Sequence, residues 1–505
     1  MRRALASLMA IALVGCGRMG GGLAQTGAPV VTQPSAVELA AFEADLEQRT
    51  FRYFWETHGD NRCLVPDRYP AHTFSSIAAT GFALTAYGIG AERGYVSRAD
   101  AAVRVRDCLR FYWNAPQGDA ASGTTGYKGF FYHFLKYEDG TRFKTVELST
   151  VDTTLLMGGV LFAQGYFDRD DPVEAEIRDL GEKLYARIDW AWAQRTQTGT
   201  QAANLANSHG IVMGWSPESG FQTHDWVGYN EGMLIYVLAA GSPTYPVGQD
   251  AWDHGWAARL GSEWGTYNGQ EHLQFEPLFG HQYSHVWIDF RGIGDPFIRS
   301  HGIDYFENSR RATLAQQGYG RANSNAWKSY SDSVWGWTAS DGPGDFKGIY
   351  SVNGKARTFM SYAARGASGI RVVDDGTVVP TAAGGSIPFA PTETLTALYT
   401  MCEIWGNRLY TPYGFKDAFN PSFTFVGAKV DAGTIDPKLG WVDGDYLGID
   451  QGPIIAMIEN HRSGLVWSVM RRNQHIKAGL KRLGFTGGWL DQPQSTSALL
   501  AMTWL

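Results

Sequence analysis

The sequence is poor in cysteine, in runs of like charge and in long apolar segments. Its 505 residues include 4 cysteines and no Cys-x-x-Cys pair, which excludes a redox motif or a cysteine-based metal site. Lysine and arginine number 43 against 50 acidic residues, and the net charge is -7 without a long basic run. Nucleic acid is therefore not an expected partner. Beyond the N-terminus, no stretch is apolar for long enough to span a bilayer.

The N-terminus has a positive start and a short apolar run, which are typical of a signal peptide. Residues 13–16 (LVGC) resemble a bacterial lipobox, in which the cysteine becomes the lipidated first mature residue. We therefore predict a lipoprotein signal peptide over 1–16 and a flexible tether over 17–36. The protein is then exported to the periplasm or outer membrane, with membrane contact only through lipid on Cys16. Ordinary secretory cleavage, for example after Ala24, is the alternative.

The remaining cysteines are Cys63, Cys108 and Cys402, an odd number that allows at most one internal disulfide. Cys108 lies in a helical pattern and is interpreted as a small core residue.

Apolar and amphipathic helical segments alternate along most of the chain, and convincing strands are scarce. One small hairpin is predicted from 370 to 379, around Asp375-Gly376. A helical pair every 60 to 75 residues or so, with one member buried, predicts an all-α fold, an (α/α)6 barrel with a single core, over residues 37–505. A two-layer helical solenoid is the alternative, but no short sequence repeat supports it.

Aromatic residues are abundant, with 18 Trp, 24 Tyr and 26 Phe. Sugar C–H faces stack on flat rings, so this surplus suits a carbohydrate-binding cleft as well as a core. Long loops rich in glycine and aromatic residues (114–146, 262–283 and 318–356) separate the predicted helices and are typical of a binding face.

One carboxylate lies in an unusually apolar segment. The pattern predicts a helix from Trp226 to Ala240 that is apolar on every side and ends at Gly241. Glu231 lies in its early part, with Asn230 as the adjacent polar side chain. An unpaired buried carboxylate is costly, so it either pairs with an arginine or holds a proton with a raised pKa. We interpret Glu231 as a general acid at the floor of a pocket.

Two further acidic positions lie near the starts of apolar helices. Ser149 and Asp152 have capping-box spacing, so Asp152 is either a structural cap or a site residue. Glu147 precedes the same helix and is harder to explain as a cap. Asp450 precedes Pro453, which is well placed as the first helical residue, so Asp450 is either a turn residue or part of the site.

Residues 280–292 place His281, His285 and Asp289 four residues apart, on one face of a predicted helix. This spacing resembles a metal site, but without further ligands or an HExxH motif it favours no metal. A polar strip that binds sugar hydroxyls, or a stabilising pair between Asp289 and Arg291, is the preferred interpretation.

Two aromatic loops carry interleaved polar residues and are interpreted as sugar-stacking platforms, with loop packing as the alternative. The first holds Tyr127, Phe130 and His133, and the second holds Trp335, Trp337 and Asp341. Several carboxylates beside aromatic platforms in a helical barrel point to glycoside hydrolysis, which uses one protonated acid and one ionised carboxylate.

Seven segments together resemble the bacterial glucoamylase-like domain, a group that includes glycoside hydrolase family 144, the β-1,2-glucanases. The resemblance runs from about residue 49 to 485. The segments are YKGFFYHF (127–134), ELSTVDT (147–153), GYNEGM (228–233), FGHQYSHVWIDFRG (279–292), YFENSRRAT (305–313), PTAAGGSIPFAP (380–391) and GIDQGP (448–453).

The resemblance implies an (α/α)6 barrel, no metal cofactor and hydrolysis with inversion. Its probable acid corresponds to Glu231, and a second essential acidic position matches Asp152, where active members often carry glutamate. Asp450 is the other candidate base. The substrate-binding residues are expected to be Tyr127, Phe130, His133, Glu147, Asp289, Arg291, Trp335, Trp337 and Asp341.

We therefore expect a monomeric lipoprotein that hydrolyses β-1,2-glucan, or a related glucan, to short oligosaccharides without a cofactor. A periplasmic oligosaccharide-binding lipoprotein and a hydrolase of another glucan, such as an α-glucan, are the alternatives. Two further alternatives are a polysaccharide lyase on a similar helical barrel and a phosphorylase.

Overall fold

The computed structural model describes residues 33–58 and 63–492. The predicted signal peptide, Cys16 and most of the predicted tether lie outside these residues. The longer helices are α1 (Ala36–Glu56), α2 (Ile77–Arg93), α3 (Arg98–Asn114), α4 (Thr150–Tyr166), α5 (Pro172–Ala186), α6 (Met233–Gly241), α11 (Tyr305–Ala322), α13 (Pro391–Trp405), α14 (Gly448–Arg462) and α16 (Gln474–Arg482). The shorter ones are α7 (Gln249–Asp253), α8 (Leu260–Glu263), α9 (Tyr283–Trp287), α10 (Pro296–Ser300), α12 (Pro380–Gly384), α15 (Leu465–Met470) and α17 (Gly488–Asp491).

The fold is mostly helical, and its many strands are short. A five-stranded sheet has the order β3-β4-β6-β7-β8, formed by β3 (Gly126–Tyr127), β4 (Phe130–Tyr132), β6 (Leu148–Ser149), β7 (Gly214–Ser216) and β8 (Gly220–Phe221). A three-stranded sheet has the order β19-β21-β20, formed by β19 (Phe419–Asn420), β21 (Gly440–Val442) and β20 (Thr434–Asp436).

The remaining strands form antiparallel pairs. These are β1 (Arg68–Tyr69) with β22 (Tyr446–Leu447), β2 (Ser75–Ser76) with β5 (Phe134–Leu135), β9 (Trp264–Tyr267) with β10 (Gln270–Leu273), β11 (Ala339–Ser340) with β14 (Ala363–Ala364), β12 (Phe346–Val352) with β13 (Lys355–Phe359), β15 (Gly366–Ala367) with β16 (Val372–Val373), and β17 (Tyr410–Thr411) with β18 (Gly414–Phe415). The predicted 370–379 hairpin is wrong, because β16 pairs with β15 and Val378 forms a bridge with Phe419.

The predicted alternation of buried and amphipathic helices is confirmed in the first half of the chain. Helices α2 and α4 are buried along nearly their whole length, and they approach closely at glycines. A Cβ at Gly81 would lie 2.2 Å from the Leu155 carbonyl oxygen, and one at Gly159 would lie 2.0 Å from that of Gly81. The flanking helices α3 and α5 are joined by the ion pair of Arg98 with Glu174, at 2.7 Å.

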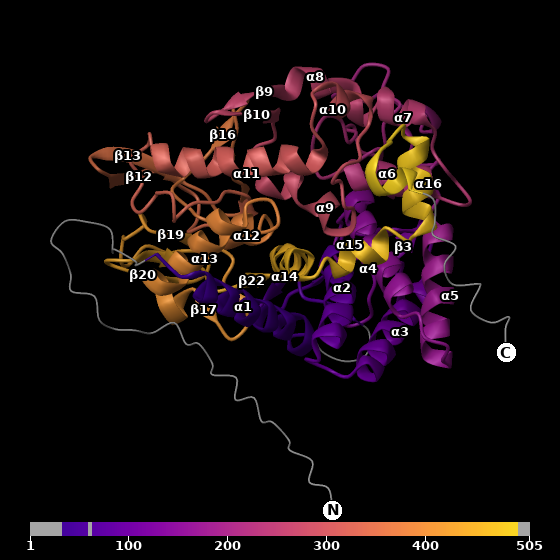
Figure 1. Cartoon of the computed structure of the whole chain (residues 1–505), viewed down its shortest axis with the longest axis horizontal. Helices are drawn as coiled ribbons and strands as arrows, with labels where there is room; N and C mark the ends of the chain where they lie inside the picture. Colours follow the sequence, from indigo (N-terminus) through magenta and orange to yellow (C-terminus); the bar gives the residue numbers. More distant parts are fainter. Residues whose placement is uncertain (1–32, 59–62, 493–505) are drawn as a thin grey trace, which may run out of the picture.

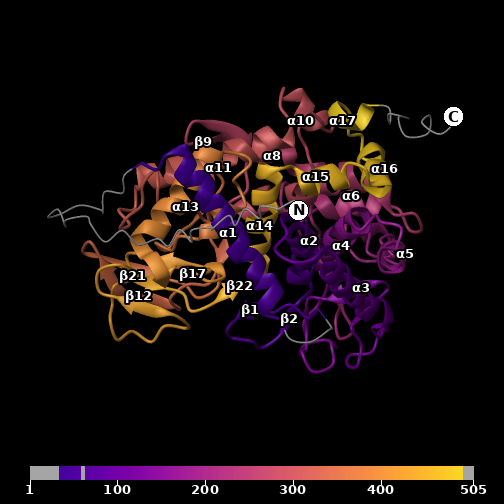
Figure 2. The ribbon, with the colours of Figure 1, turned by 60° about the horizontal axis from the view of Figure 1, so that its bottom comes forward.

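The buried apolar side chains form two clusters instead of the predicted single core. The first is built around α2, α4 and α6, and the second around α13 and the strands that follow it. Helix α14 contributes to both, because Ile455 belongs to the first cluster while Ile454 and Ile458 belong to the second. Figures 1 and 2 show α14 between the region of α2–α5 and the region of α13 and β12.

Cys108 is not merely a small core residue, because it forms a disulfide with Cys63. This bond ties the start of the segment before α2 to the middle of α3. Within the part of the chain that is described, no helix combines the length and the apolar character needed to cross a membrane.

Candidate active site

Glu231 lies in a turn before α6, not inside the longer helix predicted from the sequence. Gly228 has a left-handed φ of 82°, which interrupts the helical pattern, and α6 begins only at Met233. The turn is held by Asn230, whose side-chain oxygen accepts from the Gly232 N–H at 2.8 Å. The Ser284 hydroxyl donates to the Glu231 carbonyl at 3.3 Å. These bonds hold the backbone of the turn at Glu231.

The Glu231 carboxyl has the surroundings of a proton donor. Its side chain is partly exposed, whereas its Oε2 is buried without a hydrogen-bond partner. Burial and, to a smaller extent, the nearby charge of Asp152 raise the pKa of Glu231, and a backbone hydrogen bond lowers it. The net result is a pKa of about 7. At neutral pH, a large fraction of this carboxyl therefore holds a proton, as the sequence predicted.

Asp152 lies in the first turn of α4 and is buried. Ser149 caps the helix by accepting from the Asp152 N–H at 3.2 Å, and its hydroxyl donates to Asp152 Oδ2 at 2.5 Å. The predicted capping box is only half formed, because the Asp152 carboxylate bonds the Ser149 hydroxyl instead of its backbone N–H. Ser149 also belongs to β6, which is paired on both sides. Burial raises the pKa of Asp152, although His133 and Ser149 lower it.

His133 lies between Asp152 and Glu147. Its Nδ1 is 2.8 Å from Glu147 Oε1, and its Nε2 is 3.5 Å from Asp152 Oδ2. Burial opposes the charge on His133, but the two carboxylates outweigh it and raise its pKa to about 9. Burial raises the pKa of Glu147, but the hydrogen bond and charge of His133 outweigh this effect and bring the pKa below its usual value. His133 is thus a cation at neutral pH, flanked by two acids.

Asp450 lies inside α14, in its first turn, not before the helix. The sequence places the helix start at Pro453, but α14 begins at Gly448 and accommodates the proline. Asp450 is buried, and its Oδ2 has no hydrogen-bond partner. Burial raises its pKa to about 7, a hydrogen bond with Asp417 lowers it, and the charge of Asp341 raises it. Among the described residues, Asp450 is therefore a second carboxyl with a buried oxygen that has no hydrogen-bond partner.

Arg68 joins Asp341 to the same region. Its guanidinium is 2.7 Å from Asp341 Oδ2 and 3.2 Å from Asp67 Oδ2. Burial raises the pKa of Asp67, and the charges of Arg68 and His133 lower it. Asp67 is thus close to both His133 and Arg68, and it connects the surroundings of Asp152 with those of Asp450.

Tyr283 and Tyr362 are two site residues that sequence reasoning missed. Burial raises the pKa of Tyr283 well above its usual value, and the charges of Asp450, Glu231 and Asp152 add to the effect. Tyr283 therefore lies between the carboxyls of α14 and those beside α6. Tyr362 is 56% exposed, but burial of its hydroxyl raises its pKa, and the charge of Asp450 adds to the effect. Tyr283 belongs to the 279–292 motif, in which the sequence analysis selected the histidines, Asp289 and Arg291 as candidates.

The aromatic platforms differ from the predicted ones. Tyr127 is partly exposed and packs against Trp215 and Trp192, at ring-centroid distances of 5.1 Å and 5.6 Å. Of these three rings, Trp215 lies on β7, which pairs with β6, the strand that directly follows Glu147. They form a partly open aromatic cluster next to the carboxyls.

Three of the predicted stacking residues are buried. Phe130, Trp335 and Trp337 are each 0% exposed, and Trp337 donates its ring N–H to the Tyr330 hydroxyl at 3.0 Å. Their rings pack in the two apolar clusters and are not open to a sugar.

The His281, His285 and Asp289 strip is not a helical face, because α9 covers only Tyr283–Trp287. His281 and His285 are fully buried, and burial lowers the pKa of each. Asp289 forms an ion pair with Arg291 at 2.7 Å and another with Arg471. The stabilising pair considered from the sequence is confirmed.

Comparison with known proteins places this site in a family context. A family profile described as putative glucoamylase matches residues 223–474, which include Glu231, Tyr283 and Asp450. A solved structure of a putative glucoamylase from Bacteroides uniformis is 31% identical, with a TM-score of 0.74. The alignment covers 91% of this chain and 100% of that one.

Two relatives carry more specific descriptions. An endo-β-1,2-glucanase from Chitinophaga pinensis, solved with sophorotriose and glucose, is 26% identical with a TM-score of 0.72, over 90% of this chain and 100% of that one. An exo β-1,2-glucooligosaccharide sophorohydrolase from Parabacteroides distasonis is 26% identical over 471 residues, which is 87% of this chain. This chain spans 57% of the length of that curated relative. Because the chain is 31% identical to the Bacteroides uniformis structure and covers its full length, it belongs to the family of putative glucoamylases.

Proposed function

We propose that the protein is a glycoside hydrolase that cleaves β-1,2-glucan, or oligosaccharides derived from it, to short products. The observation that carries this proposal is the partly exposed Glu231, whose pKa of about 7 keeps a proton available at neutral pH. Similarity to an endo-β-1,2-glucanase and to a β-1,2-glucooligosaccharide sophorohydrolase supports the linkage.

In this proposal Glu231 donates its proton to the glycosidic oxygen, directly or through a relay, as the bond to the leaving sugar breaks. Asp450 accepts a proton from the attacking water, because its Oδ2 has no donor within the described residues. Asp152 is less suited to that role, since its Oδ2 already accepts from Ser149. The charge of Asp152 instead helps to keep Glu231 protonated. Glycoside hydrolysis requires one protonated and one ionised carboxyl. The pKa of Asp450 is also raised to about 7, and the hydrogen bond with Asp417, which lowers that pKa, favours the ionised form of Asp450.

Exposed aromatic and charged groups flank these carboxyls and are proposed to bind the sugars. Tyr127, with its two tryptophan neighbours, offers a partly open ring surface, and Tyr362 offers a second one. His133 and Arg68 supply hydrogen-bond donors beside the acids. Phe130, Trp335 and Trp337 act through packing in this account, because their rings are buried.

We also propose the finer architecture and location expected from the sequence. The buried helices α2, α4, α6 and α14 belong to the inner ring of an (α/α)6 barrel, and amphipathic helices such as α3 and α5 belong to the outer ring. The lipid anchor on Cys16 and the periplasmic or outer-membrane location remain proposals based on residues 1–16.

Product analysis tests the proposed reaction. The soluble chain from residue 25 is incubated with linear β-1,2-glucan and, separately, with β-1,3-glucan, β-1,4-glucan and starch. Short oligomers from the first alone are expected, and their size ladder distinguishes endo from exo cleavage. Glucose from starch would move the substrate to α-glucans. Binding of β-1,2-glucan without turnover would replace the hydrolase with an oligosaccharide-binding protein.

A further inference from the structure

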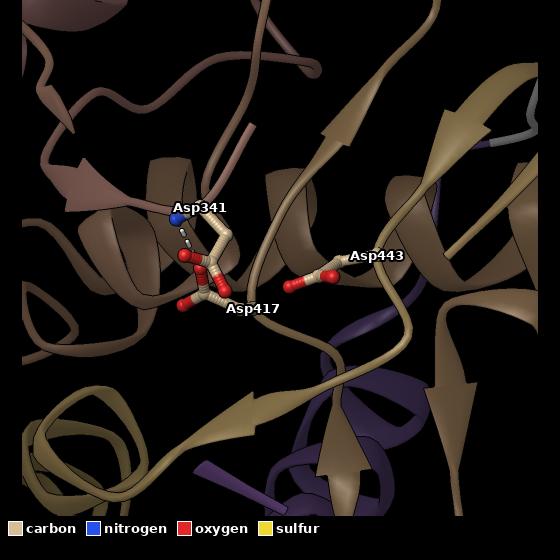
Figure 3. A group of neighbouring side chains, drawn as sticks. All are labelled: Asp341, Asp417 and Asp443. Atoms are coloured by element: carbon tan, nitrogen blue, oxygen red, sulfur yellow. Dashed lines mark hydrogen bonds between the residues drawn. The ribbon is translucent and has the colours of Figure 1, made fainter. Parts of the chain in front are cut away.

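A compact group of three aspartates lies beside α14, and the proposed hydrolysis assigns no role in bond cleavage to any of them. Asp341 follows β11, Asp417 lies between β18 and β19, and Asp443 follows β21. Each offers a carboxylate oxygen, and these oxygens all lie within 4.8 Å of one another. Figure 3 shows the Asp443 carboxylate pointing toward the other two from a separate loop.

These carboxylates are buried, and their hydrogen bonding is incomplete. Asp417 and Asp443 are 2% and 3% exposed. Asp417 Oδ2 accepts from the Asp341 N–H at 2.8 Å, and Asp443 Oδ1 accepts from the Gly444 N–H at 2.6 Å. Within the described part of the chain, Asp417 Oδ1 and Asp443 Oδ2 have no hydrogen-bond partner. Buried oxygens without a donor are rare and costly, so each calls for a ligand or a proton.

The cations nearest to Asp417 and Asp443 are engaged elsewhere. The charge of Arg365 acts on Asp417 and that of Lys416 on Asp443, but Arg365 is paired with Asp375 at 2.8 Å. Arg68 is held by Asp341 and Asp67. Lys416 donates to the Gly444 carbonyl and lies 4.3 Å from the centre of the Tyr446 ring. Across residues 33–58 and 63–492, no lysine, arginine or histidine forms an ion pair with Asp417 or Asp443.

Shared protons do not account for every orphan oxygen. Asp450 Oδ2, from α14, is the third buried oxygen without a partner, and its carboxyl neighbours Asp417. One proton shared between Asp417 and Asp450 would still leave Asp443 Oδ2 without a donor. A cation among the three loops would satisfy the oxygens of Asp341, Asp417 and Asp443 together.

We propose that Asp341, Asp417 and Asp443 form a binding site for a calcium ion that ties their three loops together beside α14. Calcium binds carboxylate oxygens at about 2.3–2.6 Å, so ligands on opposite sides of the ion are up to about 5 Å apart. Magnesium binds at about 2.0–2.1 Å, keeps several waters and is usually held by only one or two carboxylates. Three buried carboxylates within reach of one ion therefore favour calcium. The ion has a structural role in this proposal and takes no part in bond cleavage.

Calorimetry tests this site without any glucan, so its failure would leave the hydrolase proposal untouched. The full mature protein is treated with EDTA, dialysed into chelator-free buffer and titrated with CaCl2 or MgCl2. We expect one calcium ion per chain and a rise in Tm of about 2 °C or more at saturating calcium. Magnesium should bind at least tenfold more weakly. Native mass spectrometry should show the mass of one added calcium ion.

Two variants locate the ion. Asp443→Asn and Asp417→Asn keep the side-chain shape but remove a charge, and each should weaken calcium binding at least tenfold. Asp170→Asn, at an exposed position, is the matched control and should bind like the parent. No calcium binding by the parent protein, or equal binding by Asp443→Asn, would overturn the proposal. A third result would also overturn it. If, without calcium, Asp443→Asn had a higher Tm than the parent, and calcium changed neither Tm, shared protons and not an ion would hold the aspartates together.

Discussion

The site contains two groups of carboxyls that differ in their partners. The Glu231 group consists of Glu231, Asp152 and Glu147, and the Asp450 group consists of Asp450, Asp417, Asp443 and Asp341. In the first, His133 and the Ser149 hydroxyl contact the acids around Glu231. Among the described residues, three of the four acids in the second group have a buried oxygen without a donor, whereas in the first group only Glu231 does.

This difference shows that residue type alone does not decide the role of a buried acid. His133 and Ser149 favour the ionised forms of Glu147 and Asp152, and the resulting negative charge helps Glu231 to stay protonated. The donor-free oxygens of the Asp450 group are instead ready to accept a proton from water or to bind a cation. The following predictions test this division, starting with the largest expected effect.

Replacing Glu231 with glutamine should have the largest effect, because it removes the proton donor while keeping the shape. We expect kcat/KM on linear β-1,2-glucan to fall about 10²–10⁴-fold. Initial rates measured from reducing ends check this, with Asp170→Asn as the control. Near-normal turnover by Glu231→Gln would remove Glu231 from the mechanism.

Paired variants of Asp450 and Asp152 separate the two groups. Asp450→Asn should lower kcat at least about 100-fold, because it removes the proposed base. Asp152→Asn should cost less, and it should shift the alkaline limb of the pH profile of kcat/KM to lower pH. The direction follows from the charge of Asp152, which raises the pKa of Glu231. If Asp152→Asn were the more damaging change and left the pH limb in place, the two assignments would be exchanged.

Tyr362→Ala should weaken binding without slowing the chemical step. Loss of one exposed stacking ring is expected to raise KM about tenfold and to change kcat little. Tyr245 is 45% exposed and lies between α6 and α7, so Tyr245→Ala is a matched control for loss of an exposed ring. Equal KM values for the two variants would show that Tyr362 does not contact the substrate.

The smallest effect is expected on stability. A folded-state pKa of about 7 for Glu231, above its usual value of 4.5, means that folding becomes less favourable as pH rises through this range. Glu231→Gln should therefore raise Tm clearly at pH 8 and much less at pH 5, where the folded-state carboxyl is neutral like the glutamine. Differential scanning calorimetry at the two pH values checks this. A Tm gain of the same size at both would point to packing as its cause.

Much of the helical framework was predictable, because its ends carry local signals. Ser76, Ser97 and Ser149 are the N-caps of α2, α3 and α4, and a serine just before a helical pattern is a local signal of a helix start. The starts around the catalytic candidates were less predictable. The left-handed Gly228 shortens α6, and Pro453 is accommodated inside α14.

The individual candidates Glu231, Asp152 and Asp450 were also visible in the sequence, but their arrangement was not. Tyr283 lies among acids from three different segments, and Asp417 reaches Asp450 across the fold. Strands of two or three residues, such as β6 and β7, are too short to show a period of two. Contacts of this kind depend on tertiary packing and have no local signature.

The most direct test of Glu231 as proton donor compares two substrates in the same variant. A glucan leaving group needs protonation, whereas dinitrophenolate leaves without it. We predict that Glu231→Gln loses at least about 100-fold in kcat/KM on linear β-1,2-glucan but nearly retains the parent rate on a 2,4-dinitrophenyl β-sophoroside. An equal loss on both substrates, or no loss on the glucan, would contradict the account.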